Sequence, residues 1–195
     1  FKALSKEEQD KIKDVGGFVA GKLQDGRRKK GMIICRSAIT LDMDNGIFGV
    51  LEQFAKYNRY ACFVYSTHKH VLMLPRLRFV FPLRRDVSEA EYPLVARGIA
   101  KEIGLKYFDP TTYEAARLMY WPSTCRGGEF VHRRFAGNFV DPDEYLKNVC
   151  DGALPVVSPA QTRAVPLDEQ EAAVSAALKK QLNANDPFKK SGIIG

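Results

Sequence analysis

Long hydrophobic runs are missing from this chain. No stretch reaches 18 consecutive apolar residues, and no secretory signal or lipidation motif is present. A membrane-spanning helix needs about 20 such residues, so we expect no membrane partner. The chain does not begin with methionine, and its apolar end, 193–195, looks interrupted. We therefore expect it to be part of a longer protein.

Cysteine and histidine are also scarce. The four cysteines show no Cys-x-x-Cys spacing, and two of them fall in strands that we expect to be buried. Free thiols in a reducing cytoplasm therefore fit better than a disulfide framework. Cys125 and His132 could supply half of a zinc site. No second pair completes it, so no structural zinc is expected.

The composition predicts one substantial hydrophobic core, because 45% of the 195 residues are hydrophobic and 27% are charged. A formal charge of +7 suggests a polyanionic partner, although a solubilising surface would account for it as well. The distribution of the charge favours nucleic acid. The basic clusters are Arg27-Arg28-Lys29-Lys30, Arg76 with Arg78, Arg84-Arg85 and Arg133-Arg134.

Two aspartates one residue apart, Asp42 and Asp44, close an apolar run that begins at Met32. Side chains alternate along a strand, so Arg36 and both aspartates share one side. Two like charges about 4 Å apart repel by about 4 kcal/mol at an effective dielectric constant of about 20, so a cation between or beside them would be favourable. These carboxylates fit a Mg²⁺ or Mn²⁺ site for phosphoryl transfer. The alternative is a pair of solvated aspartates before the turn at Asn45-Gly46.

The spacing of apolar residues predicts an α+β fold. After a first helix, the order β-α-β-β-α-β is that of an RNA-recognition-like or ferredoxin-like sheet, with helices on one face and the other face open. We assign residues 1–150 to this domain, 151–166 to a linker and 167–195 to a helical segment that leads into a further region. The expected elements span residues 5–15, 32–43, 47–57, 60–66, 76–83, 88–104 and 118–121, followed by a hairpin around 126–128.

A second polar cluster, Tyr65-Ser66-Thr67-His68-Lys69-His70, follows the strand at 60–66. Ser66 and His68 alternate onto one side and Lys69 adds a charge, so all three could contact phosphate oxygens. In this topology the strand ends that carry Asp42 and Ser66 should be adjacent, which predicts a triphosphate site beside the metal. The alternative for His68 is an ordinary structural histidine.

The third polar cluster is Phe108-Asp109-Pro110, which is followed by Arg117 and Trp121-Pro122-Ser123. An aspartate before proline is usually a turn residue or a helix cap, and that alternative stays open for Asp109 alone. Its position as the third site in this order favours a functional role.

The order of these clusters resembles the archaeo-eukaryotic primase superfamily, also called primase-polymerases. The motifs of that superfamily are Asp-x-Asp, Ser-x-His and a hydrophobic residue followed by Asp. They correspond here to 42–44, 66–68 and 108–109. The sequence around these motifs, over roughly residues 1–146, is similar to the primase domains of phage and prophage replication proteins, including those of the virulence-associated protein E type.

The resemblance implies a DNA primase or DNA polymerase that joins nucleotides by two-metal catalysis with Mg²⁺ or Mn²⁺. Its fold would pair an RNA-recognition-like catalytic sheet with a small accessory α/β module. It assigns the catalytic metals to Asp42, Asp44 and Asp109, and the phosphates of the incoming nucleotide to Ser66 and His68. Arg117 is a further candidate for nucleotide binding.

The remaining candidates come from charge and position. Arg36 lies on the same side of its strand as Asp42 and Asp44, and Lys69 follows His68. We place both in the nucleotide site, together with Arg76 and Arg78, which project from the polar face of the strand at 76–83. The basic block, Arg27, Arg28, Lys29 and Lys30, is assigned to template phosphates. The expected partners are a single-stranded DNA template, nucleoside triphosphates and a fused or associated helicase, in the cytoplasm of a bacterial host.

Two other classes of function stay open at this point. A non-catalytic module that binds single-stranded nucleic acid would need exposed aromatic residues on its open face, where Tyr65 could serve. A rolling-circle replication endonuclease would use two histidines for its metal, such as His68 and His70. Lys69 argues against that site, because an apolar residue normally separates its histidines.

Overall fold

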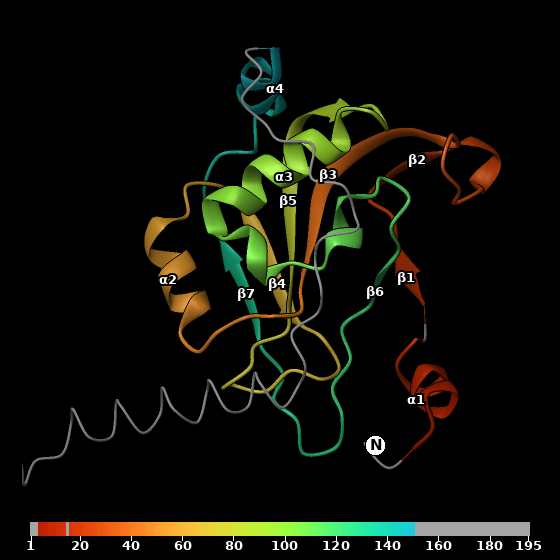
Figure 1. Ribbon diagram of the computed structural model, residues 1–195, viewed down its shortest axis with the longest axis vertical. Coiled ribbons are helices and arrows are strands. Elements are labelled where there is room, and N and C mark those ends of the chain that lie inside the picture. Colours follow the sequence, from red (N-terminus) through yellow and green to blue (C-terminus); the bar gives the residue numbers. More distant parts are fainter. Residues whose placement is uncertain (1–3, 15, 151–195) are drawn as a thin grey trace, which may run out of the picture. The chain divides into compact units, whose positions relative to one another are not determined.

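An antiparallel five-stranded sheet forms the centre of the fold (Figure 1). The computed structural model describes residues 4–14 and 16–150. These residues fall within one compact unit of the chain, Phe1–Val156. The strands of the sheet, in spatial order, are β2 (Gly21–Leu23), β3 (Ile33–Met43), β5 (Leu77–Val87), β4 (Cys62–Ser66) and β7 (His132–Phe135).

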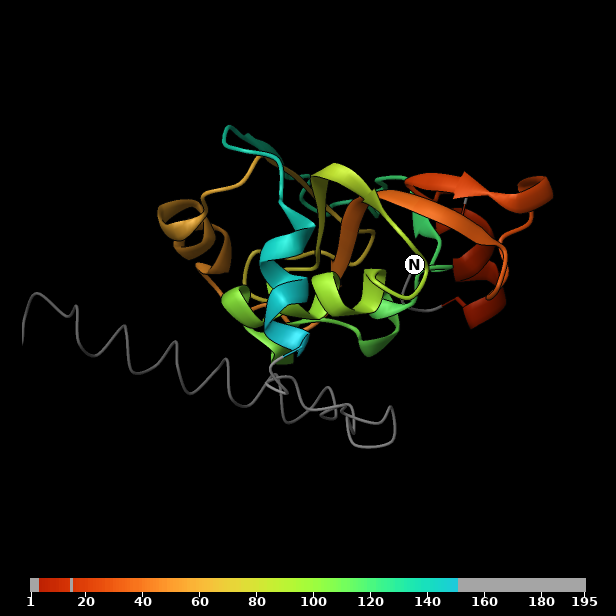
Figure 2. The same ribbon diagram turned by 90° about the horizontal axis from the view of Figure 1, so that it is seen from above.

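Helices cover one face of this sheet, and Figure 2 shows α3 and α4 together on the same side. Phe54 of α2 packs edge-on against Phe79 and Phe135, with ring centroids 5.1 Å apart in both pairs. Leu41 and Phe79 are fully buried on this face, and each such side chain contributes about 1.5–3 kcal/mol through burial. The α-helices are α1 (Lys6–Lys13), α2 (Val50–Tyr57), α3 (Tyr92–Ile103) and α4 (Pro142–Cys150), and the 3-10 helices are η1 (Gln24–Gly26), η2 (Leu105–Tyr107) and η3 (Pro110–Tyr113).

The α+β fold class is confirmed, and so are the local signals at two helix ends. Ser5 and Glu8 form the capping box at the start of α1. Gly104 ends α3 with φ 133°, a conformation that side chains with a Cβ rarely adopt. The sequence therefore specifies these ends locally, without help from the rest of the fold.

The expected last strand is in a different place. The segment expected at 118–121 forms β6 (Met119–Tyr120), which pairs with β1 (Gly17–Phe18) in a separate two-stranded sheet. In an RNA-recognition-like sheet the last strand would lie beside β3, but β2 already occupies that edge through its hairpin with β3. The outer strand is instead β7, beside β4. With α1, the β1–β6 sheet makes up the small accessory part of the fold (Figure 1).

The face opposite the helices is only partly open. Tyr65 of β4 is 2% exposed, and its hydroxyl donates to the carbonyl of Tyr120 at 2.9 Å. Arg78 of β5 donates to the same carbonyl at 2.7 Å. The expectation that Tyr65 is available for stacking is therefore wrong, because β6 passes over it. Alternation identified the face on which Tyr65 lies but not the segment that covers it.

A close contact between α3 and α4 provides a test of the packing. A Cβ atom on Gly98 would overlap with Cδ1 of Tyr145. We expect Gly98→Ala to lower the free energy of unfolding by about 1–2 kcal/mol in urea denaturation, because overpacking outweighs the helix preference of alanine. Tyr145→Ala in the same chain should remove most of the difference. Equal stability of Gly98→Ala and the parent would contradict this packing.

The expectations for 151–166 and 167–195 lie outside the described residues. No α-helix among residues 4–14 and 16–150 combines the length and the apolar character that a membrane crossing requires.

Candidate active site

Three aspartates meet where β3 ends. Asp42 and Asp44 come from the end of that strand, and the segment 107–113 runs along its free edge. The backbone N–H of Asp109 donates to the carbonyl of Asp42 at 2.9 Å, and the N–H of Asp44 donates to the carbonyl of Tyr107 at 3.1 Å. Phe108 and Met43 also form an antiparallel bridge. The first and third motifs are thus held together by backbone hydrogen bonds.

Thr112 strengthens this junction and was not identified from the sequence. Its hydroxyl accepts from the N–H of Asp42 at 2.9 Å and donates to the carbonyl of Thr40 at 3.0 Å. Thr112 is fully buried. A hydroxyl three positions after Asp109 was the only local signal, and it does not reveal a partner 70 residues away in the chain.

Each aspartate is paired with an arginine. Arg78 contacts Asp42 at 2.7 Å, Arg76 contacts Asp44 at 2.8 Å, and Arg117 contacts Asp109 at 3.2 Å. The first pair follows from the sheet register, in which Arg78 of β5 lies directly opposite Asp42 of β3. It is also the most buried of the three, with side-chain exposures of 7% for Arg78 and 10% for Asp42. Each negative charge of the three aspartates is therefore balanced by the positive charge of one arginine.

The balance leaves one carboxylate oxygen unsatisfied. Oδ1 of Asp42 is buried and has no hydrogen-bond partner, which is costly for a carboxylate. Burial, followed by the negative charge of Asp42, raises the pKa of Asp44 above its ordinary value, and Arg76 opposes that rise. Both observations indicate that the aspartates would gain from additional positive charge.

Carboxylate oxygens are the ligands that Mg²⁺ and Mn²⁺ prefer, so the donor atoms of the three aspartates suit such an ion chemically. In the part of the chain that the structure describes, no three His, Cys, Asp or Glu side chains stand close enough to hold a metal as they are placed. The carboxylates point instead to their arginines. Asp109 also acts as the expected helix cap, since it accepts from the N–H of Thr111 at 2.9 Å.

The second motif lies at the same end of the sheet. β3 and β4 both run antiparallel to β5, which lies between them, so the two strands end on the same side. The expected adjacency is therefore indirect: the start of β5, with Arg76 and Arg78, separates the two motifs. Nδ1 of His68 lies 3.1 Å from Oγ of Ser123, and Lys69 is exposed.

Ser66 does not have the expected position. It is fully buried, and its Oγ accepts from the backbone N–H of Val131 at 2.9 Å. Its hydroxyl therefore holds the segment before β7 against the end of β4. Direct contact with a phosphate is not compatible with this burial, so we leave Ser66 out of the nucleotide site.

Arg36 is also placed differently from the expectation. It is fully buried and donates to the carbonyls of Ala20 and Ala115, and its guanidinium lies 4.3 Å from the ring centroid of Tyr92. Six residues of strand separate it from Asp42, a distance of about 20 Å. Alternation put it on the correct side of the strand but at the wrong end. We therefore assign Arg36 to the packing of the fold.

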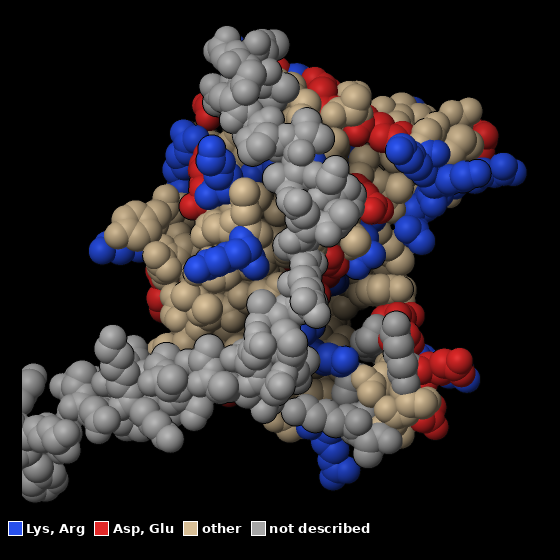
Figure 3. All heavy atoms as spheres, viewed as in Figure 1, with Lys and Arg blue, Asp and Glu red and all other residues tan. Residues whose placement is uncertain are grey.

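The basic block is exposed on the connection between β2 and β3, where Figure 3 shows blue side chains gathered at the upper right. Within it, Arg28 donates to the carbonyl of Ala116 at 3.1 Å. Nine residues of β3 separate the start of that strand from Asp42, a length of about 30 Å along the strand. Ala116 adjoins Arg117, which pairs with Asp109, so Arg28 lies closer to the candidate site than this length along the strand.

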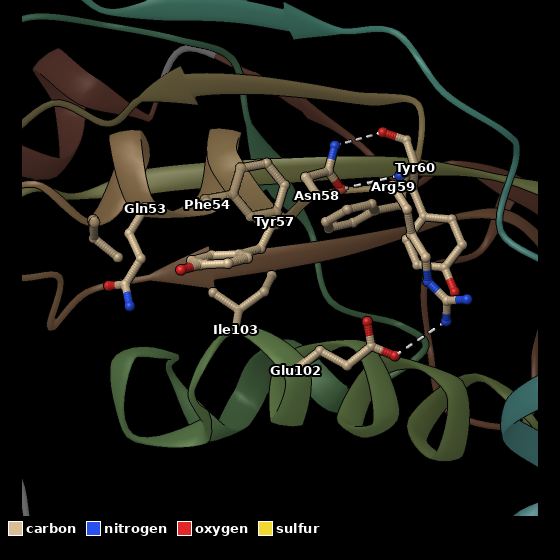
Figure 4. A pocket seen from close by; sticks show the side chains of 10 residues that line it. Gln53, Phe54, Tyr57, Asn58, Arg59, Tyr60, Glu102 and Ile103 are labelled. Carbon is tan, nitrogen blue, oxygen red and sulfur yellow. Dashed lines mark hydrogen bonds and ion pairs between the residues drawn. The ribbon is translucent and has the colours of Figure 1, made fainter.

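A pocket of about 150 Å³ lies on the helical side, between α2 and α3 (Figure 4). Phe54, Tyr57 and Ile103 supply apolar walls, and Arg59 and Glu102 form an ion pair at its rim. None of the three aspartates or their arginines lines it. The pocket is therefore separate from the candidate active site.

Residues 1–157 match the VapE N-terminal domain family, and the chain belongs to that family. This bears out the resemblance to proteins of the virulence-associated protein E type. Among solved structures, the AEP domain of the primase-polymerase of cyanophage S-2L is similar, with a TM-score of 0.49 and 18% sequence identity. The similarity covers 74% of this chain and 76% of that one. No curated protein matches the chain.

Proposed function

We propose that this domain is a template-directed nucleotidyltransferase, a DNA primase or DNA polymerase that acts in phage, prophage or plasmid replication. The observation that carries the proposal is the group of three Asp–Arg pairs at the end of β3, in which Asp42 keeps one buried oxygen without a partner. Membership of the VapE N-terminal domain family is consistent with a role in replication.

Asp42, Asp44 and Asp109 would hold the divalent cations. Bound Mg²⁺ or Mn²⁺ supplies charge neutralisation at the transferred phosphoryl group and lowers the pKa of the attacking 3′-hydroxyl. The carboxylates would fix the position of that chemistry, because all three aspartates take part in backbone hydrogen bonds between β3 and the segment 107–113. Alignment of this kind supplies much of the rate of phosphoryl transfer.

The arginines have a second use in this proposal. Arg76, Arg78 and Arg117 surround the carboxylates, and a guanidinium group binds phosphate oxygens with paired hydrogen bonds. In the ligand-free protein these arginines pair with the carboxylates. A triphosphate bound at the aspartates would instead pair with the arginines. His68 and Lys69 flank the same end of the sheet and complete the proposed nucleotide site.

The test is an incorporation assay with the full chain. Labelled deoxynucleotides and ribonucleotides are supplied with a single-stranded template, with and without a primer, in Mg²⁺ or in Mn²⁺. Template-dependent incorporation supports the proposal. Absence of incorporation under every condition, from protein that still binds the template, would reject it in favour of a non-catalytic module.

That module is the second candidate, because exposed aromatic residues do occur on the sheet and beside it. Phe63 is 40% exposed and Phe130 is 54% exposed. The rolling-circle endonuclease receives no such support. His70 is buried, and its Nδ1 accepts from the N–H of Arg76 at 3.1 Å, so part of its ring is used within the fold.

The template role of the basic block leads to a prediction about salt. Replacing Arg27, Arg28, Lys29 and Lys30 with glutamine should weaken binding of single-stranded DNA and flatten the plot of log affinity against log salt. The slope should change by about 0.7 for each phosphate group that the variant no longer binds. Nucleotide binding should change little, since the three aspartates pair with arginines outside the basic block.

The control is a pair of arginines that already have acidic partners. Arg84 lies 3.7 Å from Asp141, and Arg85 lies 2.9 Å from Glu91. Their replacement with glutamine should leave the slope almost unchanged. If the fourfold variant of the basic block keeps the slope of the parent, that block is only a solvated surface.

We further propose that a fused or associated helicase supplies the single-stranded template. Such a partner would lie outside the described residues.

A further inference from the structure

A row of side chains crosses the face of the sheet opposite the helices, and β6 covers the middle of the row. In register, Asp42 of β3 lies opposite Arg78 of β5, which lies opposite Tyr65 of β4, which lies opposite His132 of β7. The row therefore leads from the candidate active site to the far edge of the sheet. Three strand spacings of about 4.8 Å make it about 14 Å long.

The far end of this row is aromatic and exposed. Phe63 lies 5.9 Å from Tyr65 and 6.4 Å from His132, measured between ring centroids. Phe130 stacks on His132 at 5.8 Å with an interplanar angle of 17°. Tyr65 is buried, whereas Phe63, Phe130 and His132 are exposed. We call these three exposed residues the aromatic platform.

The charge beside the aromatic platform matches a nucleic-acid backbone. Arg134 lies directly opposite Phe63 in the register of β4 and β7, so it projects on the same face. It is exposed and forms no ion pair with any residue that the structure describes. Its neighbour Arg133 projects on the helical side and lies 3.3 Å from Glu52 of α2. The face with the exposed rings is thus also the face with the uncompensated positive charge.

We infer that the aromatic platform binds the bases of single-stranded DNA, with Arg134 on the backbone, on the same face of the sheet as Asp42. Stacking suits a template of any sequence, because every base presents a π-face. The inference rests on the proposed function, since a template-directed enzyme must hold unpaired bases of its template. It adds a binding surface that is distinct from the basic block.

The experiment measures equilibrium binding by fluorescence anisotropy, without nucleotide or divalent cation. One probe is an oligothymidine of about 20 nucleotides, longer than the roughly 4–16 that a single-strand-binding fold covers. The other is an abasic strand with the same backbone. The full chain is compared with Phe63→Leu and Phe130→Leu, which remove the π-face but keep an apolar side chain. Tyr57→Leu is the control, because Tyr57 is 72% exposed on the helical side.

We expect each ring variant to bind oligothymidine about five- to a hundredfold more weakly than the parent. On the abasic strand the ring variants and the parent should bind alike. Arg134→Gln should weaken binding of both probes and change the salt slope by about 0.7, whereas Arg133→Gln should not. Tyr57→Leu should match the parent on both probes.

Ring variants that bind oligothymidine as tightly as the parent would overturn the inference and leave the rings as a contact surface for another protein. An equal loss on the abasic strand would overturn it too, since the effect would not come from bases. The incorporation assay is read separately. Incorporation with normal binding by the ring variants rejects the aromatic platform alone, whereas base-dependent binding without incorporation rejects the proposed function alone.

Discussion

Replacing Asp42 or Asp44 with asparagine should reduce nucleotide incorporation by more than about a hundredfold, since changes to residues that merely support a metal ligand already cost about 10- to 100-fold. Asparagine keeps the shape of aspartate but removes the charge that the proposed cation needs. The measurement is primer extension with purified variants, and circular dichroism confirms that they are folded.

Asp25→Asn is the matched control for this loss of charge. Asp25 is exposed near the basic block and has φ 50°, a conformation that asparagine also adopts. Its replacement should leave incorporation intact. If Asp42→Asn retains the activity of the parent, the aspartates at the end of β3 are not the catalytic centre.

Arg78→Met should lower the free energy of unfolding by about 3–5 kcal/mol, because it leaves the charge of Asp42 buried without its partner. The pair is the most buried of the three, and its two atoms lie 2.7 Å apart. Arg76→Met breaks a pair in which the side chains are 29% and 37% exposed, so it should cost less than about 1 kcal/mol. Urea denaturation of the two variants gives the comparison.

Neutralising the partner should reverse most of the loss. In Arg78→Met combined with Asp42→Asn, no unpaired charge stays buried, so the double variant should be more stable than Arg78→Met alone. If Arg78→Met costs no more than Arg76→Met, or if the double variant is no more stable than Arg78→Met, Arg78 does not compensate a buried charge at Asp42.

The alternation of side chains between the two faces of a strand was the most reliable basis for prediction from the sequence. It placed Leu41 in the core and Asp42 on the opposite face, because the two-residue period is a local property of a strand. The end of α3 at Gly104 was predictable for the same reason, since a left-handed residue stops a helix locally. These features depend on neighbours in the sequence.

The errors concern partners that are distant in the sequence. Alternation put Tyr65 on the face opposite the core but could not show that Tyr120 covers it. The hydroxyl of Ser66 bonds to the backbone of Val131, 65 residues later. The strand expected to complete the sheet, β6, pairs with β1 instead, and β2 lies beside β3 in its place. Long-range packing decides these points.

The candidate site shows the same division. Motif order drew attention to Asp42, Asp44 and Asp109, and the structure brings their backbones together at the end of β3. The pairing with arginines could be predicted only in part, because the register between β3 and β5 sets Arg78 opposite Asp42. The approach of Arg117 to Asp109 depends on the loop after η3, whose course the sequence does not reveal.

The proposed cation site is tested most directly by titration of the full chain with Mn²⁺, followed by electron paramagnetic resonance of the free ion. The parent should bind Mn²⁺, and binding should tighten when a nucleoside triphosphate is present, because the arginines then have phosphate oxygens to contact. The double variant Asp42→Asn with Asp44→Asn should leave the ion free. Equal binding of Mn²⁺ by the parent and the double variant would contradict a cation site at the three aspartates.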